Sequence, residues 1–113
     1  MVTKGGAAVD NLVPNKDQFR VFQDANKVYS ATLNQADLQH NNNKFYIIQM
    51  LLNEKTGQFN VWNRWGRVGV PGQNCLKGPF SKDAAIAEYN SKIHDKTKKG
   101  NYTEIEIKYD DEE

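Results

Sequence analysis

A ten-residue run that is apolar on both faces constrains the fold of this chain more than any other feature. Residues 44–53 read KFYIIQMLLN. Alternate residues of a β-strand point to opposite faces of the sheet, and here both alternating sets are mostly apolar. The β-branched and aromatic content favours a strand over a buried helical turn. We therefore predict a central strand that other elements cover on both sides.

The flanking segments predict an antiparallel sheet with one main α-helix packed on it, an α+β fold. A turn over 53–57, in which Gly57 is free to take a positive φ, leads into a partner strand over 58–65. The helix follows Ser81, a good N-cap, and ends before Gly100. Further short strands are expected over 17–24, 26–34, 74–80 and 101–110, and polar or glycine-rich loops over 34–43 and 66–73.

The length of 113 residues suits one domain. We assign this domain to residues 17–109, with a flexible segment before it (1–16) and an acidic tail after it (110–113). The single cysteine, Cys75, excludes an intrachain disulfide, and no apolar run approaches the ~18 residues of a membrane span. The N-terminus has no apolar core of a signal peptide. We expect a protein of a reducing intracellular compartment, without membrane contact.

The net charge of +1 is unevenly distributed along the chain. Residues 110–113 are all acidic, whereas residues 44–100 hold ten basic and four acidic side chains, a local charge of +6. Such an excess suits a polyanionic partner. On charge alone, a solvated basic surface is the commoner explanation.

Catalysis and metal binding have little support in the sequence. His40 and His94 are the only histidines, and neither has a cysteine or carboxylate at metal-ligand spacing. Cys75 has no local histidine partner, and there is neither a P-loop nor a G-x-G-x-x-G motif. We expect a chain without enzymatic activity, metal or cofactor.

The segment WNRWGRVG, residues 62–69, is the best candidate for binding. Trp62 lies mid-strand in an apolar setting and is assigned to the core. Trp65 ends the strand beside Gly66 and Arg67, so its ring either caps the edge of the core or packs on a sugar or base. Arg67 offers a planar fork to phosphate, and Gly66 permits close approach of a backbone or sugar.

The segment HNNNK before the central strand is a second candidate. Its asparagines either satisfy the turn backbone or donate to phosphate and sugar oxygens, contacts that position nucleic acid without reading its sequence. Turn formation is the simpler role for Asn41, whereas Asn43 and Lys44 suit both. Lys96, in the last turn of the helix, is a candidate for binding only if the fold brings it close to Trp65.

These motifs together resemble the WGR domain of the DNA-dependent poly(ADP-ribose) polymerases. The resemblance runs over about residues 21–109, most of the chain. The shared motifs are TLNQ (32–35), NNNKFYIIQ (41–49), WNRWGRVG (62–69) and DKTK (95–98). The family's Trp-x-x-Arg-x-x-Phe segment, which precedes the position of Tyr102, has no counterpart here.

The resemblance implies a nuclear regulatory module that binds the 5′ end at a DNA strand break and relays this to a polymerase. In that family the motif tryptophan stacks on a terminal sugar and the arginine holds the neighbouring backbone. Nothing here resembles the NAD-binding catalytic domain, which would act in cis or in trans. The alternative is a domain that mainly contacts the polymerase, with DNA secondary. The candidate DNA-binding residues are Asn41, Asn43, Lys44, Trp65, Gly66, Arg67, Lys96 and Tyr102.

Overall fold

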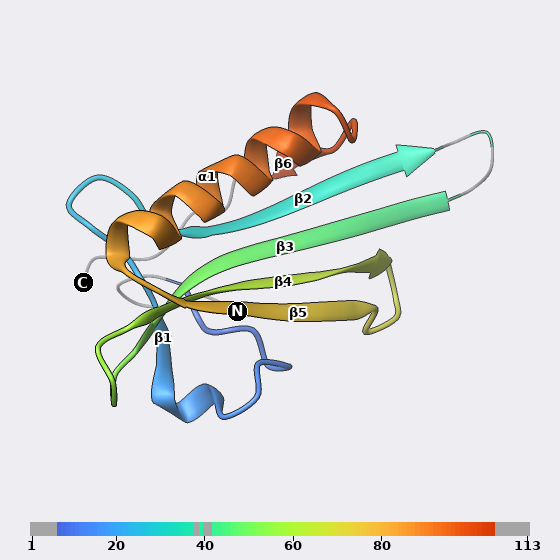
Figure 1. Ribbon diagram of the computed structural model, residues 1–113. Coiled ribbons are helices and arrows are strands. Elements are labelled where there is room, and N and C mark those ends of the chain that lie inside the picture. Colours follow the sequence, from blue (N-terminus) through green and yellow to red (C-terminus); the bar gives the residue numbers. More distant parts are fainter. Residues whose placement is uncertain (1–6, 38, 40–41, 106–113) are drawn as a thin grey trace, which may run out of the picture.

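The computed structural model describes residues 7–37, 39 and 42–105, which form a six-stranded antiparallel sheet with one long helix packed on it (Figure 1). The strands are β1 (Phe19–Val21), β2 (Ser30–Asp37), β3 (Asn42–Asn53), β4 (Phe59–Arg67), β5 (Gln73–Phe80) and β6 (Thr103–Ile105). The helices are the 3-10 helix η1 (Lys16–Gln18) and α1 (Lys82–Lys98). The spatial order is β5-β4-β3-β2-β6, and β1 pairs with the C-terminal part of β3. The predicted α+β fold is confirmed.

Strand β3 lies at the centre of the sheet and is covered on both faces, as its sequence predicts. Ile48 and Met50 are fully buried on the face that α1 covers. Leu51 is fully buried on the opposite face, where it packs with Trp62 and Val13. The two-sided apolar pattern therefore reflects two separate core clusters, one on each side of the strand.

Helix α1 has the limits that the sequence predicts, and one of its sides is buried. The Ser81 hydroxyl accepts a hydrogen bond from the backbone N–H of Ala84 at 3.3 Å and caps the first turn. Ala85 and Tyr89 are buried against the sheet. Gly100 follows the C-terminal cap, so the chain turns away from the helix at the expected position.

The loop predicted over 34–43 is wrong for most of its length. Strand β2 continues to Asp37 and β3 begins at Asn42. These segments need no apolar side chains because this end of the sheet extends past the C-terminal end of α1 (Figure 1). The side-chain amides of Asn34 and Gln35 instead donate hydrogen bonds to backbone carbonyls, at 3.1 and 2.6 Å.

Two of the predicted strands begin later or are shorter than expected near the N-terminus. Of the strand expected over 17–24 only β1 forms, after a 3-10 turn, and β2 starts later than residue 26. The loop expected over 66–73 is also shorter, because β4 continues through Arg67 and β5 begins at Gln73. The last strand is seen as β6, and residues 106–110 lie outside the described residues.

Residues 7–16, here called the N-terminal strap, lie on the sheet face opposite α1. The Asp10 carboxylate accepts hydrogen bonds from Trp62 Nε1 at 2.8 Å and from Arg64 Nε at 2.7 Å. The Asp10 backbone N–H donates to Oε1 of the buried Gln49 at 3.0 Å. The segment thus packs more closely than its composition suggests, and the domain boundary stays a prediction.

The environment of Asp10 favours its charged form. Burial raises the pKa of Asp10, but the hydrogen bonds from Arg64 and Trp62, with the charge of Arg64, outweigh burial and hold the pKa below its ordinary value of 3.8. A carboxyl group with a lowered folded-state pKa stabilises the fold above its unfolded-state pKa. That contribution is lost as the pH falls through the folded-state pKa.

We expect Asp10→Asn to lower the free energy of unfolding by about 1.5–3 kcal/mol at neutral pH, because charge-assisted hydrogen bonds are lost. The difference from wild type should shrink as the pH falls below 3.8, the ordinary pKa of this carboxyl. Urea unfolding at a series of pH values measures this, with the exposed Asp17→Asn as control. An equally large difference at neutral pH and at about pH 2 would contradict the assignment.

Candidate functional site

Most of the candidate residues meet at one end of the sheet, where β3 begins and where β4 and α1 end. In the β3–β4 register, Tyr46 lies opposite Trp65, and Lys44 lies opposite Arg67 further out. Alternate residues of a strand share a face, so all four belong to the face on which α1 packs. At this end, the sheet extends past the helix (Figure 1), which leaves the outer pair exposed.

The buried ring of Tyr46 holds three of the candidates together. The Trp65 indole stacks on it, with centroids 5.5 Å apart and an interplanar angle of 11°. Tyr102 meets the ring at 6.0 Å between centroids, and the Lys96 ammonium lies 4.8 Å from its centroid. The Tyr46 hydroxyl donates to Asn63 Oδ1 at 3.2 Å. One aromatic side chain therefore orients three candidate residues: Trp65 near the end of β4, Lys96 in the last turn of α1 and Tyr102 just before β6.

Tyr46 acts as a support and not as an acid or base. Burial raises the pKa of Tyr46 to about 12, with smaller effects from neighbouring groups such as Cys75. The hydroxyl consequently stays protonated at neutral pH and remains a donor to Asn63. Burial also raises the pKa of Tyr102.

The two tryptophans of the motif have different environments. Trp62 is 1% exposed and lies on the strap side of the sheet, where its indole N–H bonds to Asp10. Its assignment to the core is confirmed. Trp65 is only partly buried, with one face stacked on Tyr46 and packed against the core under α1. It caps the edge of the core and keeps part of its ring accessible.

Lys44 and Arg67 form a like-charge pair across two strands. Both are exposed, and they lie directly opposite each other. Like charges in this arrangement destabilise a sheet. Within residues 7–37, 39 and 42–105, neither side chain belongs to an ion pair. With Lys96 on the same face, the site is suited to an anion that carries several charges.

The remaining candidates are placed differently. Asn43 belongs to the opposite face by alternation, and its carbonyl accepts a hydrogen bond from the Val68 N–H at 2.9 Å. Asn41 lies outside the described residues. Gly66 allows close approach of the chain's own backbone, because a Cβ there would lie 2.9 Å from Gly72 Cα. Its lack of a side chain thus serves the packing at the β4–β5 end.

The sequence interpretation missed Tyr46 as a site residue. A signal for it was present, because the register set by the turn over 53–57 places position 46 opposite position 65. Pairing the two strands residue by residue outward from this turn would have identified Tyr46 as the neighbour of Trp65. The contact with Lys96 and Tyr102 had no such signal, since it depends on how the helix packs across the sheet.

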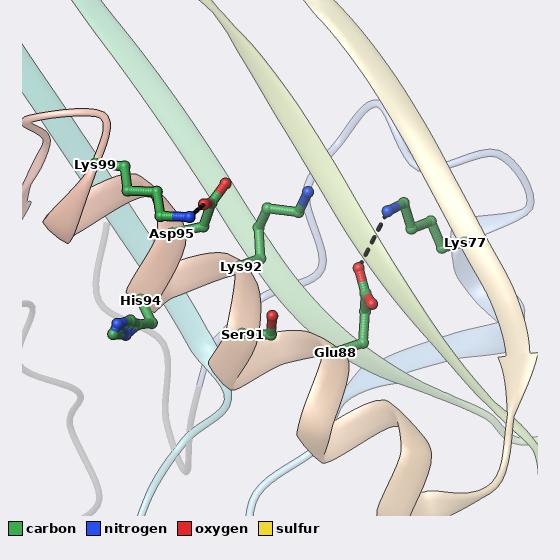
Figure 2. Close-up of a pocket in the computed structure, with 7 residues that line it drawn as sticks. All are labelled: Lys77, Glu88, Ser91, Lys92, His94, Asp95 and Lys99. Carbon is green, nitrogen blue, oxygen red and sulfur yellow. Dashed lines mark hydrogen bonds and ion pairs between the residues drawn. The ribbon is translucent and has the colours of Figure 1, made fainter.

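A separate hollow of about 370 Å³ lies between α1 and β5 (Figure 2). It is lined by Lys77, Glu88, Ser91, Lys92, His94, Asp95 and Lys99. Its two carboxylates lie near its own cations: Glu88 is 3.1 Å from Lys77, and Asp95 is 4.0 Å from Lys99. This internal pairing makes the hollow a weaker site for a polyanion than the end of the sheet.

Other kinds of site are not apparent in the described part of the chain. No three His, Cys, Asp or Glu side chains there lie close enough to hold a metal ion. No helix in the same residues is long and apolar enough to cross a membrane.

Known proteins share this region of sequence. The WGR domain profile matches residues 29–108. The chain belongs to the WGR domain family. A similar region occurs in poly(ADP-ribose) polymerase 2 of Zea mays, 50% identical over 97 residues, which are 83% of this chain and 15% of the relative. Poly(ADP-ribose) polymerase 2 of Arabidopsis thaliana is 45% identical over 98 residues, 84% of this chain and 15% of the relative.

A third relative is protein mono-ADP-ribosyltransferase PARP3 of Homo sapiens, 39% identical over 105 residues, which cover 82% of this chain and 19% of the relative. The chain therefore spans less than a fifth of the length of these three relatives. The resemblance drawn from the sequence motifs is confirmed.

We expect Trp62→Ala to cost about 3–5 kcal/mol of unfolding free energy, as for other buried tryptophans. Trp65→Ala should cost less, about 0.5–1.5 kcal/mol for the lost aromatic pair plus a small area term. Urea unfolding of both variants measures the two losses. The reverse order of stability would contradict the assignment of Trp62 to the core and of Trp65 to its edge.

Proposed function

We propose that this WGR domain binds the 5′ end at a DNA strand break and relays the binding to a poly(ADP-ribose) polymerase catalytic domain, in cis or in trans. The observation that carries the proposal is the exposed Lys44–Arg67 pair beside the partly exposed ring of Trp65. A like-charge pair becomes favourable when a polyanion neutralises it. DNA is a polyanion that also offers a sugar to an aromatic ring.

The chemistry of each residue suits a DNA end. The planar Arg67 guanidinium bonds phosphate oxygens in two places, and Lys44 and Lys96 supply point charges. Trp65 has one face supported by Tyr46, so its remaining surface is held ready for a terminal sugar. These contacts involve phosphate and sugar, which position the protein without reading the base sequence.

Recognition independent of base sequence also agrees with the role of α1. A helix that reads DNA presents polar side chains to the major groove, whereas α1 buries Ala85 and Tyr89 in the core and exposes a face with paired charges. Single-strand binding would need several separate aromatic platforms, whereas Trp65 and Tyr102 both pack on the buried Tyr46 as one cluster.

The relatives support the proposed relay to a polymerase. The proteins from Zea mays, Arabidopsis thaliana and Homo sapiens are named as ADP-ribose-transferring enzymes, and the matched region is 15–19% of each. We propose that this chain contributes the regulatory part and that the transfer chemistry lies in a separate domain. A module that responds to DNA breaks would act in the nucleus, in DNA repair.

We expect the purified chain to form no ADP-ribose product from NAD in the presence of broken DNA. Product formation can be followed with labelled NAD. A sample to which the full-length Zea mays relative is added serves as the positive control. Turnover by the chain alone would contradict its proposed role as a non-catalytic module.

We expect affinity for a duplex with one open end to fall with salt, with a slope of log K against log [salt] of roughly −3 to −5 for three to five phosphate contacts. Arg67→Ala should reduce the magnitude of this slope by about 1. Trp65→Ala should cost about 1–3 kcal/mol of binding through lost stacking. The exposed Lys55, on the turn at the other end of β3 and β4, provides Lys55→Ala as a charge-matched control.

Fluorescence anisotropy with a labelled hairpin duplex measures these affinities. A duplex closed by hairpins at both ends, and the open duplex with and without a 5′ phosphate, separate end recognition from general DNA binding. Equal affinity for open and closed duplexes would contradict end recognition. Equal effects of Arg67→Ala and Lys55→Ala would contradict the placement of the site.

A further inference from the structure

An ion pair with little exposure to solvent joins the N-terminal strap to the strand that carries the candidate site. The Asp10 carboxylate accepts from Nε of Arg64 at 2.7 Å and from its Nη2 at 3.3 Å, so both carboxylate oxygens bind one guanidinium. The Asp10 side chain is 8% exposed and the Arg64 side chain is 17% exposed. Pairing at two points fixes the plane of a guanidinium as well as its position. Asp10 therefore sets the orientation of Arg64.

Arg64 in turn holds the loop between β4 and β5. Its Nη1 donates to the Pro71 carbonyl at 2.9 Å. The guanidinium carbon lies 5.1 Å from the centre of the Phe45 ring, which supports the guanidinium between strap and loop. A single side chain thus connects the two segments, because its three nitrogens bind the carboxylate on one side and the carbonyl on the other.

The loop packs against the backbone of the two main candidate residues, Trp65 and Arg67. The Val70 N–H donates to the Arg67 carbonyl at 3.3 Å. Gly72 lies so close to the Trp65 carbonyl that a Cβ at position 72 would clash with it. Close-packed protein passes the displacement of one segment on to its neighbours. A shift of Pro71 would therefore move the backbone from which both candidate side chains project.

Few apolar contacts hold the strap against the sheet. Val13 is the one buried apolar side chain among residues 7–16. The other anchor is polar: the buried Gln49 accepts from the Asp10 N–H and donates to the Ala8 carbonyl, both at 3.0 Å. A segment that buries few apolar side chains opens at a lower free energy than the core of its domain. The strap thus has a docked and an open arrangement, and the ion pair with Arg64 favours the docked one.

We infer that Asp10 and Arg64 are positioning residues for DNA-end binding, so that docking of the strap and binding of a DNA end favour each other. The docked strap fixes the loop between β4 and β5 through the Arg64 guanidinium, and the loop fixes the backbone of the site. This coupling rests on the proposed function and adds a means of regulating the same site. Coupling between two sites is reciprocal. A bound DNA end therefore stabilises the docked strap by the factor by which the docked strap strengthens DNA binding.

The sign of the effect separates this coupling from general electrostatics. Loss of a carboxylate makes the chain more positive, which by itself strengthens the binding of a polyanion. The coupling predicts the reverse for Asp10→Asn, namely weaker binding. Arg64→Lys leaves the net charge unchanged and keeps an ammonium near Asp10. A lysine lacks the planar fork that spans the carboxylate and the Pro71 carbonyl, so this variant should also bind DNA ends more weakly.

Fluorescence anisotropy with a hairpin duplex that has one open end measures the affinities of Asp10→Asn and Arg64→Lys. Arg20→Lys is the matched control for the second variant, since Arg20 pairs with Glu54 at 3.4 Å on an exposed part of the surface. Asp17→Asn, at an exposed position, controls for the loss of a carboxylate. Thermal unfolding of every variant sets the temperature of the titrations, at which all must be folded.

Each test variant should bind the open-ended duplex about fivefold more weakly or worse, the lower end of typical couplings between linked sites. The two controls should stay within about twofold of the unsubstituted chain. The slope of log K against log [salt] should be the same for Arg64→Lys as for the unsubstituted chain, because no phosphate contact is lost. In the unsubstituted chain, saturation with the open-ended duplex should slow amide hydrogen exchange in residues 7–16 by a similar factor. A duplex closed at both ends should leave that exchange unchanged.

Three results would overturn the coupling while DNA-end recognition stands. The first is unchanged or stronger binding by Asp10→Asn together with unchanged binding by Arg64→Lys. The second is a smaller salt slope for Arg64→Lys, which would make Arg64 a direct phosphate contact. The third is strap exchange that the open-ended duplex does not slow, and this measurement decides if a test variant fails to fold. The proposed function fails in a different way, since the unsubstituted chain would then bind open and closed duplexes equally.

Discussion

The stacking of Trp65 on Tyr46 is the contact on which the candidate site depends. The position of Tyr46 is fixed by the core, because its hydroxyl bonds to the buried Asn63 and its ring is enclosed between sheet and helix. Trp65, Tyr102 and Lys96 then take their positions from that ring. Residues that are distant in the sequence thus form one surface. The aromatic contact belongs to both the core and the site.

The opposite face of the sheet supports the same end of the molecule by other means. Asp10, on the N-terminal strap, holds Trp62 and Arg64 through charge-assisted hydrogen bonds, and Arg64 continues to the Pro71 carbonyl. This chain of contacts links the strap to the loop between β4 and β5. The segment WNRWGRVG therefore has two structural halves: Trp65 and Arg67 belong to the helix side, whereas Trp62 and Arg64 belong to the strap side.

The sequence predicted the elements whose signal is local. The two-sided apolar pattern of β3 and the different faces of Trp62 and Trp65 follow from the alternation of side chains along one strand, and the start of α1 follows from the N-cap residue Ser81. The extension of β2 through Asp37 was missed because its polar side chains bond to backbone carbonyls instead of packing in a core. The strap was missed because its main anchor is a single carboxylate, Asp10, whose partners lie more than fifty residues away.

The two indole N–H resonances provide the most direct test of DNA-end binding, since the chain has only two tryptophans. A hairpin duplex with one open end is titrated into isotopically labelled protein, and a duplex closed at both ends is the control. The Trp65 resonance should shift with the open-ended duplex and much less with the closed one, while the buried Trp62 resonance stays in place. An unchanged Trp65 resonance, or shifts confined to amides of the hollow between α1 and β5, would contradict this account.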